Sequence, residues 1–252
     1  MNNRFKEQFK NSQVVSGSTF QSEVGPISAH AEIQSYRDKN YKKKHYVSTA
    51  SYTQEIDFSI LPMASESYCI SDDPKDYVIV PLGIVSVDLP NRNNESFSIE
   101  ECSYFDPRYG MPIYKTFVNK PTHREHKNDD PTKALGMHLD ATLEYVKKYD
   151  VWKISVLTIW DRTKDVQRVN DIINKKVTGY SMGAFVDCFS CSICAAQDVN
   201  IKPCEHGVGG WGNTFGENKR MAFKNLLGVC FFETSSVVSP ADDTAFSTDV
   251  FV

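Results

Sequence analysis

The stretch Gly179-Tyr180-Ser181-Met182-Gly183 lies in the middle of segment 177–187, which the sequence predicts to be extended. Side chains alternate between the two faces of a strand, so Ser181 would share its face with a glycine on either side. Because glycine has no side chain, we expect these flanking positions to be clear for the backbone of a substrate. The clearance makes Ser181 a candidate nucleophile, and the simpler interpretation is a serine in a glycine-rich strand turn.

The same five residues match G-x-S-x-G, the nucleophile elbow of α/β-hydrolases, which would make the chain an esterase of that type. An elbow needs a strand before the serine and a helix after it. Here the order is reversed, because 165–176 has the apolar periodicity of a helix and 184–187 reads as extended. The partner histidine should also come late in the chain, yet only His206 follows Ser181. The flanking segments therefore disfavour the α/β-hydrolase interpretation.

Length and composition predict one globular protein with a sizeable core. The chain has 252 residues, 40% of them hydrophobic, and a formal net charge of -4. The length suits one large domain or one domain with appendages, and the charge gives no general case for nucleic acid. No apolar run approaches the ~20 residues of a membrane span, and the N-terminus lacks the apolar core of a secretory signal. We expect a reducing, cytoplasmic setting, with no membrane and no specific nucleic acid as partners.

Two regions differ in character. Residues 1–75 are predicted to be a polar N-terminal arm or extension, and 76–252 a domain that carries the candidate site. The predicted elements of this domain are strands at 77–87 (broken or at a sheet edge at Pro81), 135–146, 152–160 and 226–238, and a short helix at 97–102.

A loop at 120–131 contains His123 and His126 together with several acidic residues. Histidine is the usual general base for a serine hydroxyl, because its pKa lies near the working pH. A metal site formed by the two histidines is the alternative, disfavoured because no helix frames them and no cysteine lies beside them. We expect His138, on the first arm of the 135–160 hairpin, to be packed and not catalytic.

Seven cysteines without a secretory signal indicate thiols or a metal site in place of a disulfide framework. Cys191 and Cys194 are two residues apart, and Cys204 and His206 follow nine residues later. Such spacing lets four soft ligands meet at one ion, and Cys3His is a common set for structural zinc. We predict a zinc clip in an insertion at about 188–215, with reduced thiols or a redox pair as alternatives and Cys188 as a spare ligand.

Four segments, taken in order, resemble the prohead (procapsid maturation) proteases of tailed bacteriophages over roughly residues 75–246. They are the Lys-Pro-x-x-x-x-His loop at 120–126, the strand ending in Asp161-Arg162, the helix leading into Val-Thr-Gly-Tyr-Ser-Met-Gly-Ala at 177–184, and Phe-Glu-Thr-Ser-Ser-Val-Val-Ser-Pro-Ala-Asp at 232–242. The Cys-Ser-Ile-Cys insertion is similar to that of a large-phage branch. Each segment alone is weak, but the ordered set is specific.

The resemblance implies an α+β fold related to herpesvirus assemblin, with a mostly β, barrel-like core and helices around it. It also implies a serine endopeptidase in which Ser181 is the nucleophile and His126 the base, with His123 as the alternative base. The zinc is not needed for this chemistry.

The third catalytic member is left open. Assemblins use a second histidine after the serine, and here only His206 follows it, better placed as a metal ligand. Asp187 and Asp140 are the acidic candidates. The sequence does not identify the oxyanion donors.

The resemblance further implies the substrates and the setting. They are the phage scaffold protein and the N-terminal segment of the major capsid protein, cut inside the assembling prohead in the host cytoplasm during capsid maturation. Members often cleave themselves, so the polar arm would be a propeptide or a scaffold-docking segment. A noncatalytic capsid or structural module of the same fold, with a structural zinc, is the alternative of a different class.

Overall fold

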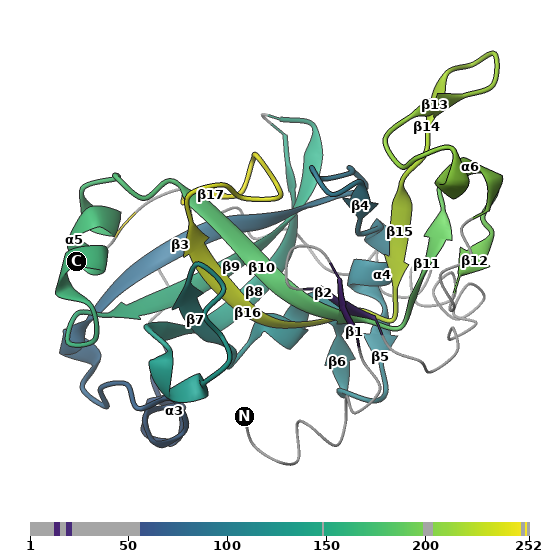
Figure 1. The fold of residues 1–252 in the computed structure, drawn as a ribbon. Helices are drawn as coiled ribbons and strands as arrows, with labels where there is room; N and C mark the ends of the chain where they lie inside the picture. The colour runs from purple at the N-terminus through teal and green to yellow at the C-terminus, as the bar shows by residue number, and fades with distance from the viewer. Residues whose placement is uncertain are drawn as a thin grey trace.

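The computed structural model describes residues 13–15, 19–21, 56–147, 149–198, 204–247 and 250. Most of the polar N-terminal arm predicted at 1–75 therefore lies outside the described residues. The described part is strand-rich and α+β, as predicted, and its largest sheet curls into a half-barrel (Figure 1).

The half-barrel is a nine-stranded sheet. Its spatial order is β1 (Gln13–Val15), β2 (Thr19–Gln21), β10 (Gly179–Val186), β16 (Cys230–Val237), β7 (Pro121–Arg124), β8 (Gly136–Val146), β9 (Val151–Asp161), β3 (Tyr77–Val87) and β17 (Phe246–Ser247). The hairpin predicted around residues 147–150 is confirmed as β8 and β9, which pair antiparallel.

A second, four-stranded sheet lies to the right of the half-barrel in Figure 1. Its order is β12 (Gln197–Asp198), β11 (Cys188–Cys191), β15 (Lys224–Leu227) and β4 (Glu95–Ser96), and two short hairpins pair β5 (Phe105–Asp106) with β6 (Met111–Pro112) and β13 (Thr214–Phe215) with β14 (Arg220–Met221). Because β11 follows β10 almost directly, the small sheet continues from the strand that carries Ser181.

The described helices are short. They are α3 (Leu61–Tyr68), α4 (Ile99–Ser103), α5 (Val166–Ile173) and α6 (Glu205–Val208), with 3-10 turns η2 (Pro74–Asp76), η3 (Ile113–Phe117) and η4 (Pro131–Lys133). The helix predicted before the Ser181 strand is confirmed as α5, where the side chain of Asp165 accepts the Arg168 N–H as a cap and Val169 and Ile172 are buried. Among the described residues, no helix has the length and apolar character to cross a membrane.

One strand prediction needs correction, and the alternatives left open for another are decided. The segment predicted as one strand at 226–238 is two strands in different sheets, because Gly228 has a φ of +66° and interrupts it. A Cβ at Gly228 would overlap the Asp187 carboxylate, so only glycine fits this break. The strand at 77–87 is not broken at Pro81, and its irregularity falls between Gly83 and Val85. Among the described residues, the other neighbour of β3 is the two-residue β17, which pairs at Leu82 and Gly83, so Pro81 lies near the sheet edge, where a proline is tolerated.

The buried apolar side chains form two main clusters and a small third one of Phe185, Cys230 and Phe232. The larger main cluster includes Phe117, Trp160, Tyr180 and Phe231, and the smaller main cluster includes Leu61, Ala64, Ile70, Tyr77, Met137 and Ile159. Residues of α3 thus pack with β3, β8 and β9, although they precede the domain boundary predicted at 75/76.

Candidate active site and metal centre

Ser181 lies in a row of three polar residues on adjacent strands. It pairs with Ser235 of the antiparallel β16, and Ser235 is level with His123 of the parallel β7. Residues in register on neighbouring strands place their side chains on the same face. Ser181 is 7% exposed, and its strand runs on to Val186 and is followed by the strand β11, not by a helix. It therefore does not stand at the strand-to-helix turn that an α/β-hydrolase elbow needs.

His126 is brought back over β16 by a tight turn after β7. Glu125 and His126 have φ values of 50° and 53°, and the N–H of Lys127 donates to the carbonyl of Arg124 at 3.1 Å. Two successive left-handed residues other than glycine are uncommon, and such backbone is concentrated at functional sites. The turn lets the N–H of His126 donate to Ser235 Oγ at 3.1 Å, beside the strand partner of Ser181.

Glu233 is the carboxylate that holds His126, and the sequence analysis missed it. His126 Nδ1 lies 2.7 Å from Glu233 Oε1, and the hydroxyl of Ser235 donates to Glu233 Oε2 at 2.8 Å. The side chain of Glu233 is 0% exposed. A carboxylate on Nδ1 favours the tautomer with its proton there, which leaves Nε2 free to accept a proton.

The two glycines beside Ser181 do not leave open space for a substrate, contrary to the expectation from the sequence. A Cβ on Gly183 would lie 2.6 Å from Phe232 Cζ and 3.0 Å from Glu233 Cγ, and a Cβ on Gly179 would lie 2.7 Å from the carbonyl oxygen of Val237. Real Cβ atoms do not approach this closely. The glycines are needed because β16 and its side chains fill the space, and Gly183 makes room first for the ring of Phe232 and then for Glu233.

Both aspartates considered as the third member have other partners. Asp187 Oδ2 accepts a hydrogen bond from Arg108 Nη1 at 2.8 Å, and Asp140 Oδ1 accepts one from Lys115 Nζ at 2.5 Å. Among the described contacts, the carboxylate that meets an imidazole of the 120–131 loop is Glu233.

His123 and His138 are buried. Burial lowers the pKa of His123, which is 1% exposed and whose Nδ1 has no hydrogen-bond partner among the described residues. Burial also lowers the pKa of His138 to about 3, and its ring stands edge-on to Phe117 with centroids 5.6 Å apart. His138 is therefore a neutral, packed side chain, as expected.

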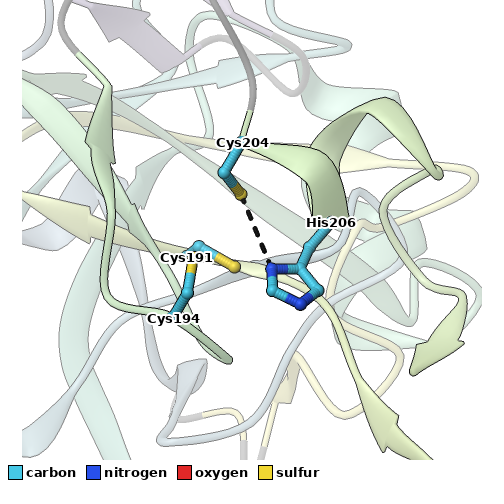
Figure 2. A group of neighbouring side chains, drawn as sticks. All are labelled: Cys191, Cys194, Cys204 and His206. Carbon is cyan, nitrogen blue, oxygen red and sulfur yellow. Dashed lines mark hydrogen bonds between the residues drawn. The ribbon is translucent and has the colours of Figure 1, made fainter. Parts of the chain in front are cut away.

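Cys191, Cys194, Cys204 and His206 come together, as their spacing predicts (Figure 2). One ligand atom from each lies within 4.8 Å of every other, and Cys204 Sγ is 3.9 Å from His206 Nδ1. Cys191 ends β11, whereas Cys204 and His206 stand at the start of α6. Cys188 is outside this group of described ligands.

Backbone hydrogen bonds shape the turn that carries Cys191 and Cys194. The N–H of Ala195 donates to the Cys191 carbonyl at 2.9 Å and closes the turn that carries Cys194, while the N–H of Ile193 lies 3.4 Å from Cys191 Sγ. Burial opposes ionisation of Cys204, but a hydrogen bond from the Gly207 backbone and the side chain of His206 outweigh it and lower the pKa of the thiol to about 7. A thiolate at neutral pH is the form that binds a metal, so the four side chains can hold a metal ion.

Comparison of the chain with protein-family models, with curated proteins and with solved structures found no match. The function is therefore argued from the residues and the two sites.

Proposed function

We propose that this protein is a serine endopeptidase with an assemblin-like core, in which Ser181, His126 and Glu233 act together. One observation carries the proposal: Ser235, the strand partner of Ser181, accepts the His126 N–H and donates to the carboxylate that holds His126. Ser235 thus links the proposed base and the proposed orienting acid at the strand position beside Ser181, which supports the assignment of these three residues to a catalytic triad.

In this proposal each of the three groups has a defined step. His126 Nε2 takes the proton of the Ser181 hydroxyl as Ser181 Oγ attacks the scissile carbonyl, and His126 then gives the proton to the leaving amine. Glu233 stabilises the imidazolium and fixes the ring through Nδ1. Water hydrolyses the acyl-enzyme by the same route, with His126 again as base.

The resemblance to prohead proteases supplies the proposed substrates. These are the phage scaffold protein and the major capsid protein, cut inside the prohead during capsid maturation, and the chain itself is a further candidate substrate.

The proposal is tested by incubating the purified full chain with scaffold and capsid protein and following their cleavage. Ser181→Ala should abolish cleavage, since loss of a triad nucleophile costs on the order of 10⁶ in rate. Ser67→Ala, a serine exposed on α3, is the matched control and should leave the rate unchanged. Equal, rapid cleavage by both variants would refute the role of Ser181. No cleavage by the wild type, with a normal fold, would favour the noncatalytic capsid module.

We also infer that the Cys/His cluster holds a structural zinc ion. Zinc–sulfur bonds of about 2.3 Å in a tetrahedral site place the ligand atoms about 3.5 to 3.8 Å apart. The distance of 3.9 Å between Cys204 Sγ and His206 Nδ1 is close to this range. All four positions are filled by protein ligands, which is typical of structural and not catalytic zinc. Zinc would fasten the turn after β11 to α6 and so stabilise the small sheet.

A further inference from the structure

Helix α5 lies on the face of the sheet opposite to Ser181. Its buried apolar residues belong to the same cluster as Tyr180. Tyr180 and its strand partner Ser236 are the chain neighbours of Ser181 and Ser235, and successive side chains of a strand point to opposite faces. The helix therefore lies behind the row of polar residues that contains Ser181 and Ser235.

Arg168 reaches from α5 to β16 and is largely buried. Its side chain is 10% exposed, and Nε donates to Ser236 Oγ at 2.9 Å. The hydroxyl of Ser236 donates in turn to the carbonyl of His123 on β7 at 3.4 Å. These two hydrogen bonds link α5, β16 and β7 behind the candidate active site.

The same arginine lies beside the first residue of the turn that carries His126. Glu125 Oε1 is 3.8 Å from Arg168 Nη2, and the N–H of Glu125 donates to the carbonyl of Ser236 at 3.1 Å. The side chain of Glu125 is thus paired with Arg168, and its backbone with the residue that Arg168 binds. Glu125 and His126 are both left-handed, a backbone that persists only where the surrounding structure holds it.

A second ion pair joins α5 to the same turn, but it is more exposed. Arg124 Nη1 lies 3.6 Å from Asp165 Oδ2, and the two side chains are 54% and 26% exposed. Water and salt screen exposed ion pairs and leave them weak. Arg168 is therefore the stronger of the two ties between α5 and the turn.

Helix packing alone does not explain a buried arginine at this position. Among the described residues, Arg168 Nη2 has no hydrogen-bond partner, and its distance to Glu125 is longer than a hydrogen bond. Taking a guanidinium out of water is costly, and apolar residues of similar size often serve packing better. The contact of Arg168 with the turn of His126 supplies a reason for its presence.

We propose that Arg168 is a positioning residue for the candidate base: it holds the turn at residues 125 and 126, and thereby keeps the imidazole of His126 on Glu233. The inference rests on the proposed function and adds to it the residue that sets the position of the base. Because Arg168 lies on the face opposite to Ser181, it does not touch the substrate. Its loss should therefore affect the chemical step and not substrate binding.

Kinetics of purified full-length variants test the effect on the reaction, with phage scaffold protein as the substrate. Arg168→Met keeps most of the side-chain length but loses both contacts. It should lower kcat by about 10²-fold, the effect of displacing a catalytic group by about 1 Å, with KM unchanged. Arg168→Lys keeps a charge for Glu125 but lacks the planar fork, so it should recover part of the rate. Gln167→Met, at the neighbouring exposed position of α5, is the matched control.

Glu125→Gln tests the same contact without removing a buried group, since the side chain of Glu125 is 39% exposed. It should lower kcat by a smaller factor than Arg168→Met, because the backbone bond to Ser236 remains. In the Arg168→Met background it should have no further effect, because its partner is absent. A normal kcat for Glu125→Gln would overturn the inference, and this result decides it even if Arg168→Met does not fold.

The imidazole reports its own position without any cleavage. The full chain carrying Ser181→Ala is labelled with nitrogen-15 histidine, and the His126 signals are identified by their loss in His126→Ala. At about pH 9, above the usual histidine pKa of about 6.5, the nitrogen shifts show which ring atom carries the proton. We expect the proton on Nδ1, held by Glu233, and a mixture of both tautomers once Arg168→Met is added.

The outcomes separate this inference from the proposed function. Cleavage by Arg168→Met at the rate of Gln167→Met would overturn the inference and leave the protease standing. Equal losses in Arg168→Met and Arg168→Lys, with the His126 tautomer unchanged, would show an anchor for α5 and overturn the positioning role. A change of tautomer in a chain whose wild type cleaves nothing would support the positioning role and refute the protease.

Discussion

Replacing Glu101 by glutamine should make the protein more stable at alkaline pH. Glu101 lies on α4 and is 3% exposed, and it accepts the N–H of Val229 at 2.9 Å, next to the break between β15 and β16. Burial raises the pKa of this carboxyl from 4.5 to about 7, and the nearby charges of Asp187 and Asp106 act in the same direction, against the backbone hydrogen bonds. The folded protein therefore keeps Glu101 protonated at pH values where the unfolded chain has lost the proton.

The sign and size of the effect follow from this difference. A group whose pKa is higher in the folded state contributes its stability below the unfolded pKa and loses it as the pH rises through the folded pKa. A pKa difference of about 2.5, at 1.36 kcal/mol for each tenfold change, corresponds to about 3 kcal/mol lost between about pH 4.5 and 7. Glutamine keeps an oxygen for the Val229 N–H but cannot ionise, so Glu101→Gln should lack this loss.

Urea unfolding followed by tryptophan fluorescence at pH 5 and pH 8 measures the difference. We expect similar free energies of unfolding for wild type and Glu101→Gln at pH 5, and a variant that is more stable by about 2 to 3 kcal/mol at pH 8. Burial also raises the pKa of Glu95, Glu144 and Asp187, so the variant keeps part of the pH dependence. Glu66→Gln, on an exposed position of α3, is the control. A variant that loses stability in parallel with the wild type would refute the assignment to Glu101.

Further predictions concern the two sites. Glu233→Gln should lower the cleavage rate by up to about 10⁴-fold, as when a triad aspartate becomes asparagine; a near-normal rate would remove Glu233 from the catalytic unit. His126→Ala should be nearly as inactive as Ser181→Ala, and the double variant little worse than either, because the groups act as one unit. His123→Ala should lower the cleavage rate less than His126→Ala does. If His123→Ala is inactive and His126→Ala is active, His123 and not His126 is the base. Protein purified without chelator should contain one zinc per chain by elemental analysis, and Cys191→Ser should lose it together with several kcal/mol of stability; a zinc-free wild type with freely titratable thiols would contradict the metal centre.

Local patterns in the sequence predicted the local features. The helix at α5 follows from its apolar stripe and the Asp165 cap, and the β8–β9 hairpin follows from strand alternation around a polar turn. The metal cluster was also predictable, because two closely spaced ligand pairs limit how far their side chains can be from one ion.

The contacts of the candidate active site depend on long-range pairing that no local pattern contains. Glu233 meets His126 because β7 lies parallel to β16, more than 100 residues away, and because residues 125 and 126 turn in the left-handed region. Asp187 directly follows the Ser181 strand in the sequence, but its carboxylate binds Arg108, which lies 79 residues earlier in the chain. The space beside Gly183 is filled by side chains of β16, a pairing that the local sequence around Ser181 does not contain.

The central claim is that Ser181 is activated by His126, and covalent labelling tests it most directly. The full-length protein is treated with a fluorophosphonate probe, which phosphonylates activated serines, and the labelled residue is located by peptide mass mapping. The account predicts one label per chain, on Ser181, that is lost in His126→Ala and retained in Ser67→Ala. Labelling of another serine, or Ser181 labelling that is unaffected by His126→Ala, would contradict it.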